Sequence, residues 1–542
     1  MYKSIPPDSL SEQTEANNTN NPHNPWNPIS TWLLFTTSIL TILPVWLPAY
    51  PAMADLPQHA AQVAMLRELH SPNFAYAALF HVNWFTPYLF GYMLIYALAP
   101  LFGILAACKL AVSLYVVGIP LSTALLLSYA NIDVFWAILS IPAIYGFTYQ
   151  WGFLNFLIAA PVGILFLWFV LGFSKNMRAR TAVCFAAAAI GLFFCHALIC
   201  AFFGMCAVLC LLAEAKSFSK ILKRILPLAA VVPVAALWMH RTLANPVTHR
   251  PIVWDLNWRD SVESYYTSLS QELHFPSTSW GRITGFFPRL LGDVPSWRCI
   301  LIGAALFVLP FCAGMRLTKK PSRWAPFLIC IAVLLWCPHA VFGTDYVYQR
   351  FTMFAIPLFL FLLRESPVSP RRTNIVRTIS LALVAALIAS ASIKAVIFSR
   401  QTKAFTQALA HVQPGQRALS LAFDHEDGVS IAPTFLHFPQ WYAAQKHGIA
   451  DPSAAMMHPE LVVFRPGKVP PAVLWDFEWA PEQFNWDDYS GELYRYFVVR
   501  SKTDRGPSLF AQAPCAVTLR FHQEEWWLYE SAPTCPAASR DQ

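Results

Sequence analysis

Long apolar runs alternate with short polar segments through the first three-quarters of the chain. The first run, TWLLFTTSILTILPVWLPAY, begins at Thr31, and similar runs recur as far as residue 398. A helix needs about 20 apolar residues to cross a hydrocarbon core roughly 30 Å thick. The pattern therefore predicts an all-α polytopic membrane bundle of about eleven or twelve helices. The candidate spans are residues 31–47, 85–103, 105–129, 133–149, 152–173, 181–196, 198–213, 222–240, 299–315, 324–342, 351–363 and 376–398.

One stretch of this pattern does not fit a continuous helix. Residues 141–156, IPAIYGFTYQWGFLNF, combine proline, glycine and several aromatic residues. Irregular backbone at membrane depth is tolerated only where protein or a cavity buries it. We therefore expect a re-entrant, broken or fused segment in this region.

The polar pattern changes after Arg400. Strand-like stretches at 460–464, 494–500 and 525–530 alternate with turns rich in proline and aspartate, which predicts a small α/β domain over residues 401–542. Residues 1–29 are rich in Asn, Pro and Ser and are expected to form a disordered leader rather than a signal peptide. The membrane domain is thus expected to cover residues 30–400.

Composition and charge fit this organisation. The chain is 56% hydrophobic and only 13% charged, whereas soluble domains carry about 25% charged residues. A net charge of +8 raises nucleic acid as a partner, but the basic residues cluster in short loops, which topology explains better. The positive-inside rule places those loops in the cytoplasm. It leaves the loops 48–84, 241–298 and 343–350, together with the domain after residue 400, on the outer side.

The first outer loop contains the stretch ADLPQH. Asp55 followed three residues later by Gln58 is typical of a helix start, in which Asp55 caps the first turn and Gln58 reaches back to it. The same helix would place Asp55, His59 and Gln62 on one face. An acid desolvated beside the membrane can act as a general base. Both interpretations of Asp55 remain open at this point.

A later outer loop, PHAVFGTDYVYQR, ends at Arg350. This arginine could extend its charge to the membrane surface or pair with Asp345. It could also bind a phosphate group, because a guanidinium matches phosphate oxygens in a bidentate way. His339, Tyr346 and Gln349 could then add hydrogen bonds or stacking to a sugar.

The long outer loop 241–298 mixes Trp and Tyr with Arg and Asp. An aromatic belt at a membrane interface has this composition without any ligand. Sugar sites also use such residues, so this loop is a weaker candidate for acceptor binding.

The cysteines separate into two groups. Ten of the twelve lie in or beside apolar runs, where cysteine behaves as a small hydrophobic residue, and their spacing around His196 matches no metal-ligand pattern. Cys515 and Cys535 lie in polar sequence. An oxidising outer compartment would allow these two to form a disulfide.

The layout of the chain resembles the GT-C class of membrane glycosyltransferases, in which an essential acidic residue follows the first transmembrane helix. Three short motifs carry the resemblance. They are a D-x-P-x-H stretch (Asp55, Pro57, His59), a G-x-x-N-F stretch (Gly152, Asn155, Phe156) and a D-x-x-x-x-R stretch (Asp345, Arg350).

The resemblance implies a GT-C-like enzyme of the bacterial inner membrane. Such an enzyme moves a sugar from a polyprenyl-phosphate donor to a glycan or lipid acceptor at the outer face. Asp55 would take the acceptor proton, with His59 orienting it, while Arg350, held by Asp345, would steady the departing phosphate. The expected substrate-binding residues are His59, Gln62, His339, Asp345, Gln349 and Arg350. No adjacent aspartate pair like that of some GT-C members occurs in the loop that carries Asp55, so whether a divalent metal takes part is left open.

Two other function classes fit parts of the sequence. A transporter or flippase for a lipid-linked substrate would use the same polar residues to line a pathway, but transporters often contain internal repeats, and none is visible here. A non-catalytic assembly partner would simply present the domain after residue 400. A nucleic-acid partner is not expected.

Overall fold

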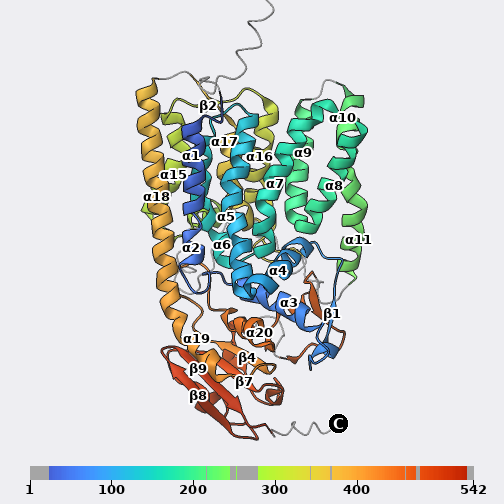
Figure 1. The fold of residues 1–542 in the computed structure, drawn as a ribbon, viewed down its shortest axis with the longest axis vertical. Helices are drawn as coiled ribbons and strands as arrows, with labels where there is room; N and C mark the ends of the chain where they lie inside the picture. Colours follow the sequence, from blue (N-terminus) through green and yellow to red (C-terminus); the bar gives the residue numbers. More distant parts are fainter. Residues whose placement is uncertain are drawn as a thin grey trace, which may run out of the picture.

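The computed structural model describes residues 24–214, 217–244, 252, 279–341, 344–366, 369–457, 459–471 and 477–533. Figure 1 shows long helices running side by side, with the C-terminal strands gathered at one end of the bundle. The expected helical membrane bundle with a C-terminal α/β domain is confirmed.

Four helical segments in the described part of the chain are long and apolar enough to cross a membrane. They comprise α1 (Pro28–Leu40) with α2 (Leu43–Trp46), α5 (Ile104–Tyr129), α7 (Leu154–Phe173) and α18 (Pro370–Gln401), which continues through α19 (Lys403–Ala408). A fifth candidate is a pair bent by 42°, formed by α10 (Phe218–Ile225) and the segment ending in α11 (Val231–Leu243).

Shorter apolar helices fill the rest of the bundle. They are α4 (Leu89–Phe102), η4 (Val134–Tyr145), α8 (Ala179–Cys195), α9 (Ala197–Ala213), α15 (Trp297–Cys312), α16 (Pro321–Trp336) and η8 (Gln349–Phe354) with α17 (Ala355–Phe361). Two small helices, α13 (Ser279–Thr284) and α14 (Phe286–Leu291), precede α15.

The irregular segment lies where the sequence predicts it. Residues 134–145 form the 3-10 helix η4, followed by the short helix α6 (Phe147–Trp151) and a break at Gly152, where φ is +81°. The expectation of one regular span over 133–149 is therefore wrong. Every residue from 132 to 161 is buried. Protein rather than lipid therefore surrounds this backbone, which is required because an irregular backbone has polar groups that lipid cannot hydrogen-bond.

The C-terminal domain is built on a five-stranded mixed sheet with the strand order β5-β4-β7-β9-β8. Its strands are β4 (Arg417–Ala422), β5 (Ile449–Asp451), β7 (Tyr496–Arg500), β8 (Val517–Gln523) and β9 (Trp526–Ser531). Alternate residues serve two cores. Ala418 and Val498 face the main core shared with the membrane domain, whereas Leu419 and Val499 face a second core at the far side of the sheet.

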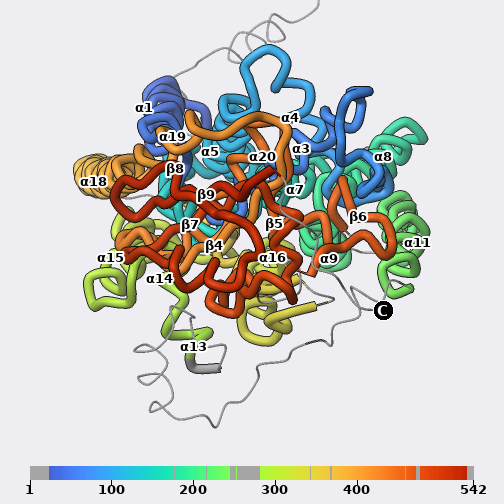
Figure 2. The backbone as a smooth tube through the Cα atoms, turned by 90° about the horizontal axis from the view of Figure 1, so that it is seen from below, coloured from blue at the N-terminus to red at the C-terminus, as the bar shows by residue number. Residues whose placement is uncertain are grey.

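The C-terminal domain also packs directly on the segment 48–84 that follows the first apolar span. Helix α20 (Trp441–Lys446) packs on α3 (Leu56–Glu68), and β6 (Val462–Phe464) pairs antiparallel with β1 (Phe80–Val82). The strand expected near 460–464 thus forms, but it pairs with the first loop instead of the domain's own sheet. Figure 2, seen from the domain end, shows the C-terminal chain crossing over the end of the bundle.

Candidate functional site

The position of Asp55 is set by the irregular segment beside it. The backbone N–H groups of Ala54 and Asp55 donate to the carbonyl oxygens of Gln150 and Trp151, at 2.9 and 2.8 Å. A Cβ at position 152 would lie 2.9 Å from the backbone nitrogen of Asp55. Gly152 is therefore needed both for its positive φ and for this close approach. Two of the three sequence motifs meet at this contact.

The capping interpretation of Asp55 is wrong. Asp55 occupies the N-cap position of α3, but its side chain makes no capping hydrogen bond. Gln58 does not reach back to it either. The Gln58 amide instead donates to the carbonyl oxygen of Pro452 at 3.0 Å and accepts from the N–H of Ala454 at 2.9 Å.

The carboxylate of Asp55 faces the C-terminal domain. Its Oδ1 lies 2.8 Å from Nδ1 of His437. On the other side of the same imidazole, Oε1 of Glu478 lies 3.7 Å from Nε2. No hydrogen bond from the described residues reaches Oδ2 of Asp55. The described residues therefore hold one carboxylate oxygen of Asp55 and leave the other without a hydrogen bond.

Two carboxylates keep the His437 imidazole charged. Burial alone would lower the pKa of His437, but the hydrogen bonds and negative charges of Asp55 and Glu478 outweigh burial and raise it to about 10. At neutral pH this side chain is an imidazolium that donates to Asp55.

A second buried chain of hydrogen bonds begins one turn further along α3. Nδ1 of His59 lies 2.8 Å from the hydroxyl of Tyr92, and that hydroxyl donates to Glu460 of the C-terminal domain. Burial lowers the pKa of His59 to about 4 in spite of the nearby Asp55. Burial also raises the pKa of Glu460 to about 7, against the effect of the Tyr92 hydrogen bond. His59 is therefore neutral, and its hydrogen-bond partner is Tyr92 and not Asp55.

Arg350 lies inside the protein and does not extend to the membrane surface. Its guanidinium carbon is 3.5 Å from the ring centre of Phe153, and its Nη2 donates to the backbone oxygen of Asp345 at 2.8 Å. Its Nε is buried and has no hydrogen-bond partner among the described residues. The positive charge of Arg350 acts on both Asp55 and His59, so the structure brings these three predicted residues into one site.

The other predicted residues divide into two groups. His339 and Gln349 lie together, with 2.7 Å between Nδ1 and Nε2, and the ring of Tyr346 bridges His339 and Trp151 at 5.1 and 4.5 Å between ring centres. Gln62 is fully buried elsewhere. Its amide oxygen accepts from the N–H of Val462 at 2.8 Å, so it holds the C-terminal domain to α3.

His196 has a structural role. Its Nδ1 accepts from the N–H of Leu198 at 3.2 Å and caps α9. Among the described residues there is no group of three or more His, Cys, Asp or Glu side chains placed to hold a metal ion.

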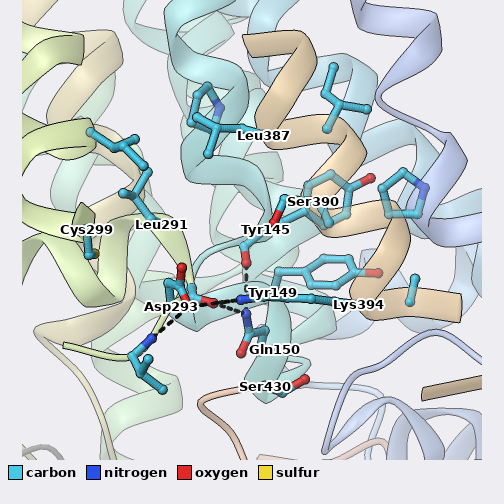
Figure 3. Close-up of a pocket in the computed structure, with 18 of the residues that line it drawn as sticks. Tyr145, Tyr149, Gln150, Leu291, Asp293, Cys299, Leu387, Ser390, Lys394 and Ser430 are labelled. Carbon is cyan, nitrogen blue, oxygen red and sulfur yellow. Dashed lines mark hydrogen bonds and ion pairs between the residues drawn. The ribbon is translucent and has the colours of Figure 1, made fainter. Parts of the chain in front are cut away.

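A separate cavity of about 500 Å³ lies between α18, α15 and the irregular segment. Figure 3 shows Leu387, Leu291 and Cys299 at one end, with Lys394, Asp293, Gln150 and Ser430 at the other. Lys394 pairs with Asp293 at 3.2 Å. The lining also includes Ala52, three residues before Asp55, so the cavity borders the loop that carries the acid.

Sequence reasoning missed the partners that the C-terminal domain contributes. Helix α20 packs on α3, and His437, four residues before α20, binds Asp55. Tyr92, Glu460 and Glu478 were also missed. No local pattern signals them, since His437 and Asp55 are 382 residues apart in sequence.

Some expectations fall outside the described residues. Most of the aromatic loop 241–298 lies there, as does Cys535. Cys515 is disulfide-bonded.

Comparisons with known proteins give a structural similarity only. No family model and no curated protein matches the chain. The structure is similar to that of ArnT from Cupriavidus metallidurans bound to undecaprenyl phosphate, at 12% identity over 94% of this chain and 98% of that one, with a TM-score of 0.42. The apo form of the same protein gives 11% identity, 92% and 97% coverage and a TM-score of 0.41.

Proposed function

We propose that the protein is a glycosyltransferase that moves a sugar from a polyprenyl-phosphate donor to an acceptor hydroxyl at the outer face of the membrane. The proposal rests on one observation. The Asp55 carboxylate, with one oxygen open, shares a site at the end of a membrane bundle with the buried guanidinium of Arg350. The donor class follows from the resemblance of the sequence to GT-C enzymes.

The proposed reaction inverts the configuration at the anomeric carbon of the sugar. The acceptor oxygen attacks the anomeric carbon while its proton passes to Oδ2 of Asp55, which acts as the general base. The bond between the anomeric carbon and the phosphate oxygen breaks, and polyprenyl phosphate leaves with the electron pair. Arg350 compensates the charge that grows on the departing phosphate.

The surrounding side chains suit a sugar. The rings of Trp151 and Tyr346 offer apolar faces beside the site, and the His339–Gln349 pair offers hydrogen-bonding groups. We assign the binding of sugar hydroxyls to this pair and to His59.

We assign the polyprenyl chain to the cavity between α15 and α18 (Figure 3). Its apolar end points along the bundle, and its polar end lies near Ser430 of the C-terminal domain. An isoprenyl tail with a phosphate head also has one apolar and one polar end. The cavity lining contains two cationic side chains, Lys394 and Arg298, and one anionic side chain, Asp293, which favours an anionic head group.

The test is transfer by purified protein in nanodiscs, supplied with a panel of polyprenyl-phosphate sugars and with glycan and lipid acceptors. We expect product from the wild-type protein and none from Asp55→Asn. Movement of the intact donor across a proteoliposome membrane without transfer would identify a transporter instead. A reporter that places the C-terminal domain in the cytoplasm would also refute the proposal, because the site would then face the wrong side.

A further inference from the structure

The C-terminal domain is fixed to α3 along the turns that follow Asp55. Gln58 bonds to Pro452 and Ala454, Gln62 bonds to Val462, and α20 packs along the same helix. Side chains at a site keep a defined geometry when rigid elements hold them on several sides. The residue that this arrangement places against Asp55 is His437.

His437 lies between two carboxylates. Its side chain is 14% exposed, against 22% for Asp55 and 27% for Glu478. Nδ1 faces Asp55 at 2.8 Å and Nε2 faces Glu478 at 3.7 Å. Burial lowers the pKa of two other imidazoles nearby, His425 and His59, and the positive charge of His437 lowers both further. Because each ring nitrogen faces an anion, a proton on both nitrogens is favoured.

We infer that His437 is a positioning residue of the transferase: its imidazole, supplied by the C-terminal domain, holds Oδ1 of Asp55 and so turns Oδ2 of Asp55 toward the acceptor hydroxyl. This inference rests on the proposed function. Asp55 remains the group that takes the proton, because both nitrogens of His437 already carry one. Glu478 holds the imidazolium from the side away from Asp55.

This role makes the C-terminal domain part of the active site. A bare carboxylate at the start of α3 could rotate, whereas a charge-assisted hydrogen bond to Oδ1 fixes its orientation. The chain that supplies this bond follows β4 and is held by the same contacts that join the domain to α3.

A second histidine–carboxylate pair on the same two elements provides a matched control. Nδ1 of His447 lies 2.7 Å from Oε1 of Glu68, at the other end of α3. The His447 side chain is 69% exposed, and pairs of this kind contribute little. His447→Gln should therefore behave as the wild type.

The kinetic test compares His437→Gln, His437→Leu and His447→Gln in the nanodisc assay over a range of pH. His437→Gln keeps a neutral donor near Asp55, and we expect kcat to fall about 10-fold with KM for the donor nearly unchanged. His437→Leu should lose on the order of 100-fold.

A second readout needs no activity. The pKa of His437 is raised to about 10, against 6.5 for an unperturbed histidine. Protonated His437 therefore stabilises the folded protein fully below about pH 6.5, and this stabilisation is lost as the pH rises to about 10. The melting temperature of the wild type should fall over this interval more than that of His437→Gln. If no donor is turned over by the wild type, the proposed function fails while this measurement still tests the ion pair.

The two readouts together decide the inference. If His437→Gln and His437→Leu retain the wild-type kcat, the positioning role is refuted. It is also refuted if the wild type and His437→Gln lose the same number of degrees between pH 6.5 and 10, since the imidazolium then does not bind Asp55 in solution.

Discussion

Substitution of Asp55 by asparagine separates the chemistry of this residue from its structural contribution. The structure predicts a small structural cost. No helix cap is lost, because the Asp55 side chain makes none, and an asparagine oxygen can still accept from Nδ1 of His437. What disappears is the charge-assisted part of one hydrogen bond, about 1 kcal/mol on the usual scale of neutral and charged hydrogen bonds.

The catalytic cost should be far larger. Asparagine cannot take a proton from the acceptor, so kcat should fall at least roughly 100-fold, which corresponds to about 3 kcal/mol of transition-state stabilisation. Asp55→Glu should restore little activity, since an added methylene displaces the carboxylate from the held position. Asp55→Ala should cost more stability than Asp55→Asn, because it leaves the imidazolium of His437 facing no acceptor at this position.

The assay is single-turnover sugar transfer in nanodiscs, with the melting temperature measured on the same samples. We expect Asp55→Asn to melt within a few degrees of the wild type while transferring no measurable sugar. An Asp55→Asn protein with activity within a few-fold of the wild type would refute the assignment of Asp55 as the base. A variant that fails to fold would instead refute the claim that its structural contribution is small.

Three further predictions concern Arg350, Glu460 and the cavity between α15 and α18. Arg350→Lys keeps the positive charge but loses the bidentate geometry, so the rate of transfer from the donor should fall about 10-fold while expression is retained. Arg350→Ala should lower this rate further. Equal transfer rates in all three proteins would show that Arg350 does not bind the phosphate. The pKa of Glu460 is raised to about 7, so its folded form binds a proton that the unfolded chain releases near pH 4.5. Relative to Glu460→Gln, the wild type should therefore lose about 3 kcal/mol of stability as pH rises from 4.5 to 7, and parallel denaturation curves for the two proteins would contradict this. Leu387→Trp should fill the apolar end of the cavity and raise KM for long-chain donors but not for short-chain analogues; equal effects on both would place the isoprenyl chain elsewhere.

Local features of the chain were predicted well from the sequence. The apolar runs identify membrane helices because the requirement for about 20 apolar residues depends on bilayer thickness and not on neighbouring segments. The start of α3 directly after Asp55, the broken backbone around Gly152 and the strand over 496–500 were likewise predicted from proline, glycine and apolar patterning. Each of these depends on residues close together in the chain.

The partners of the polar side chains were decided only by the tertiary structure. A cap by Asp55 contributes on the order of 1 kcal/mol, and a charged hydrogen bond to His437 competes with it at about 1.5–3 kcal/mol. A segment 382 residues away places the His437 imidazole 2.8 Å from the carboxylate. Asp55 therefore makes the stronger hydrogen bond to His437 instead of the cap. Because the C-terminal domain packs on α3, Gln58 and Gln62 also form hydrogen bonds with the backbone of that domain. Residue types in the first loop thus indicated that an acid was present, but only the packing of the C-terminal domain determined which oxygen of that acid is held and which one is left open.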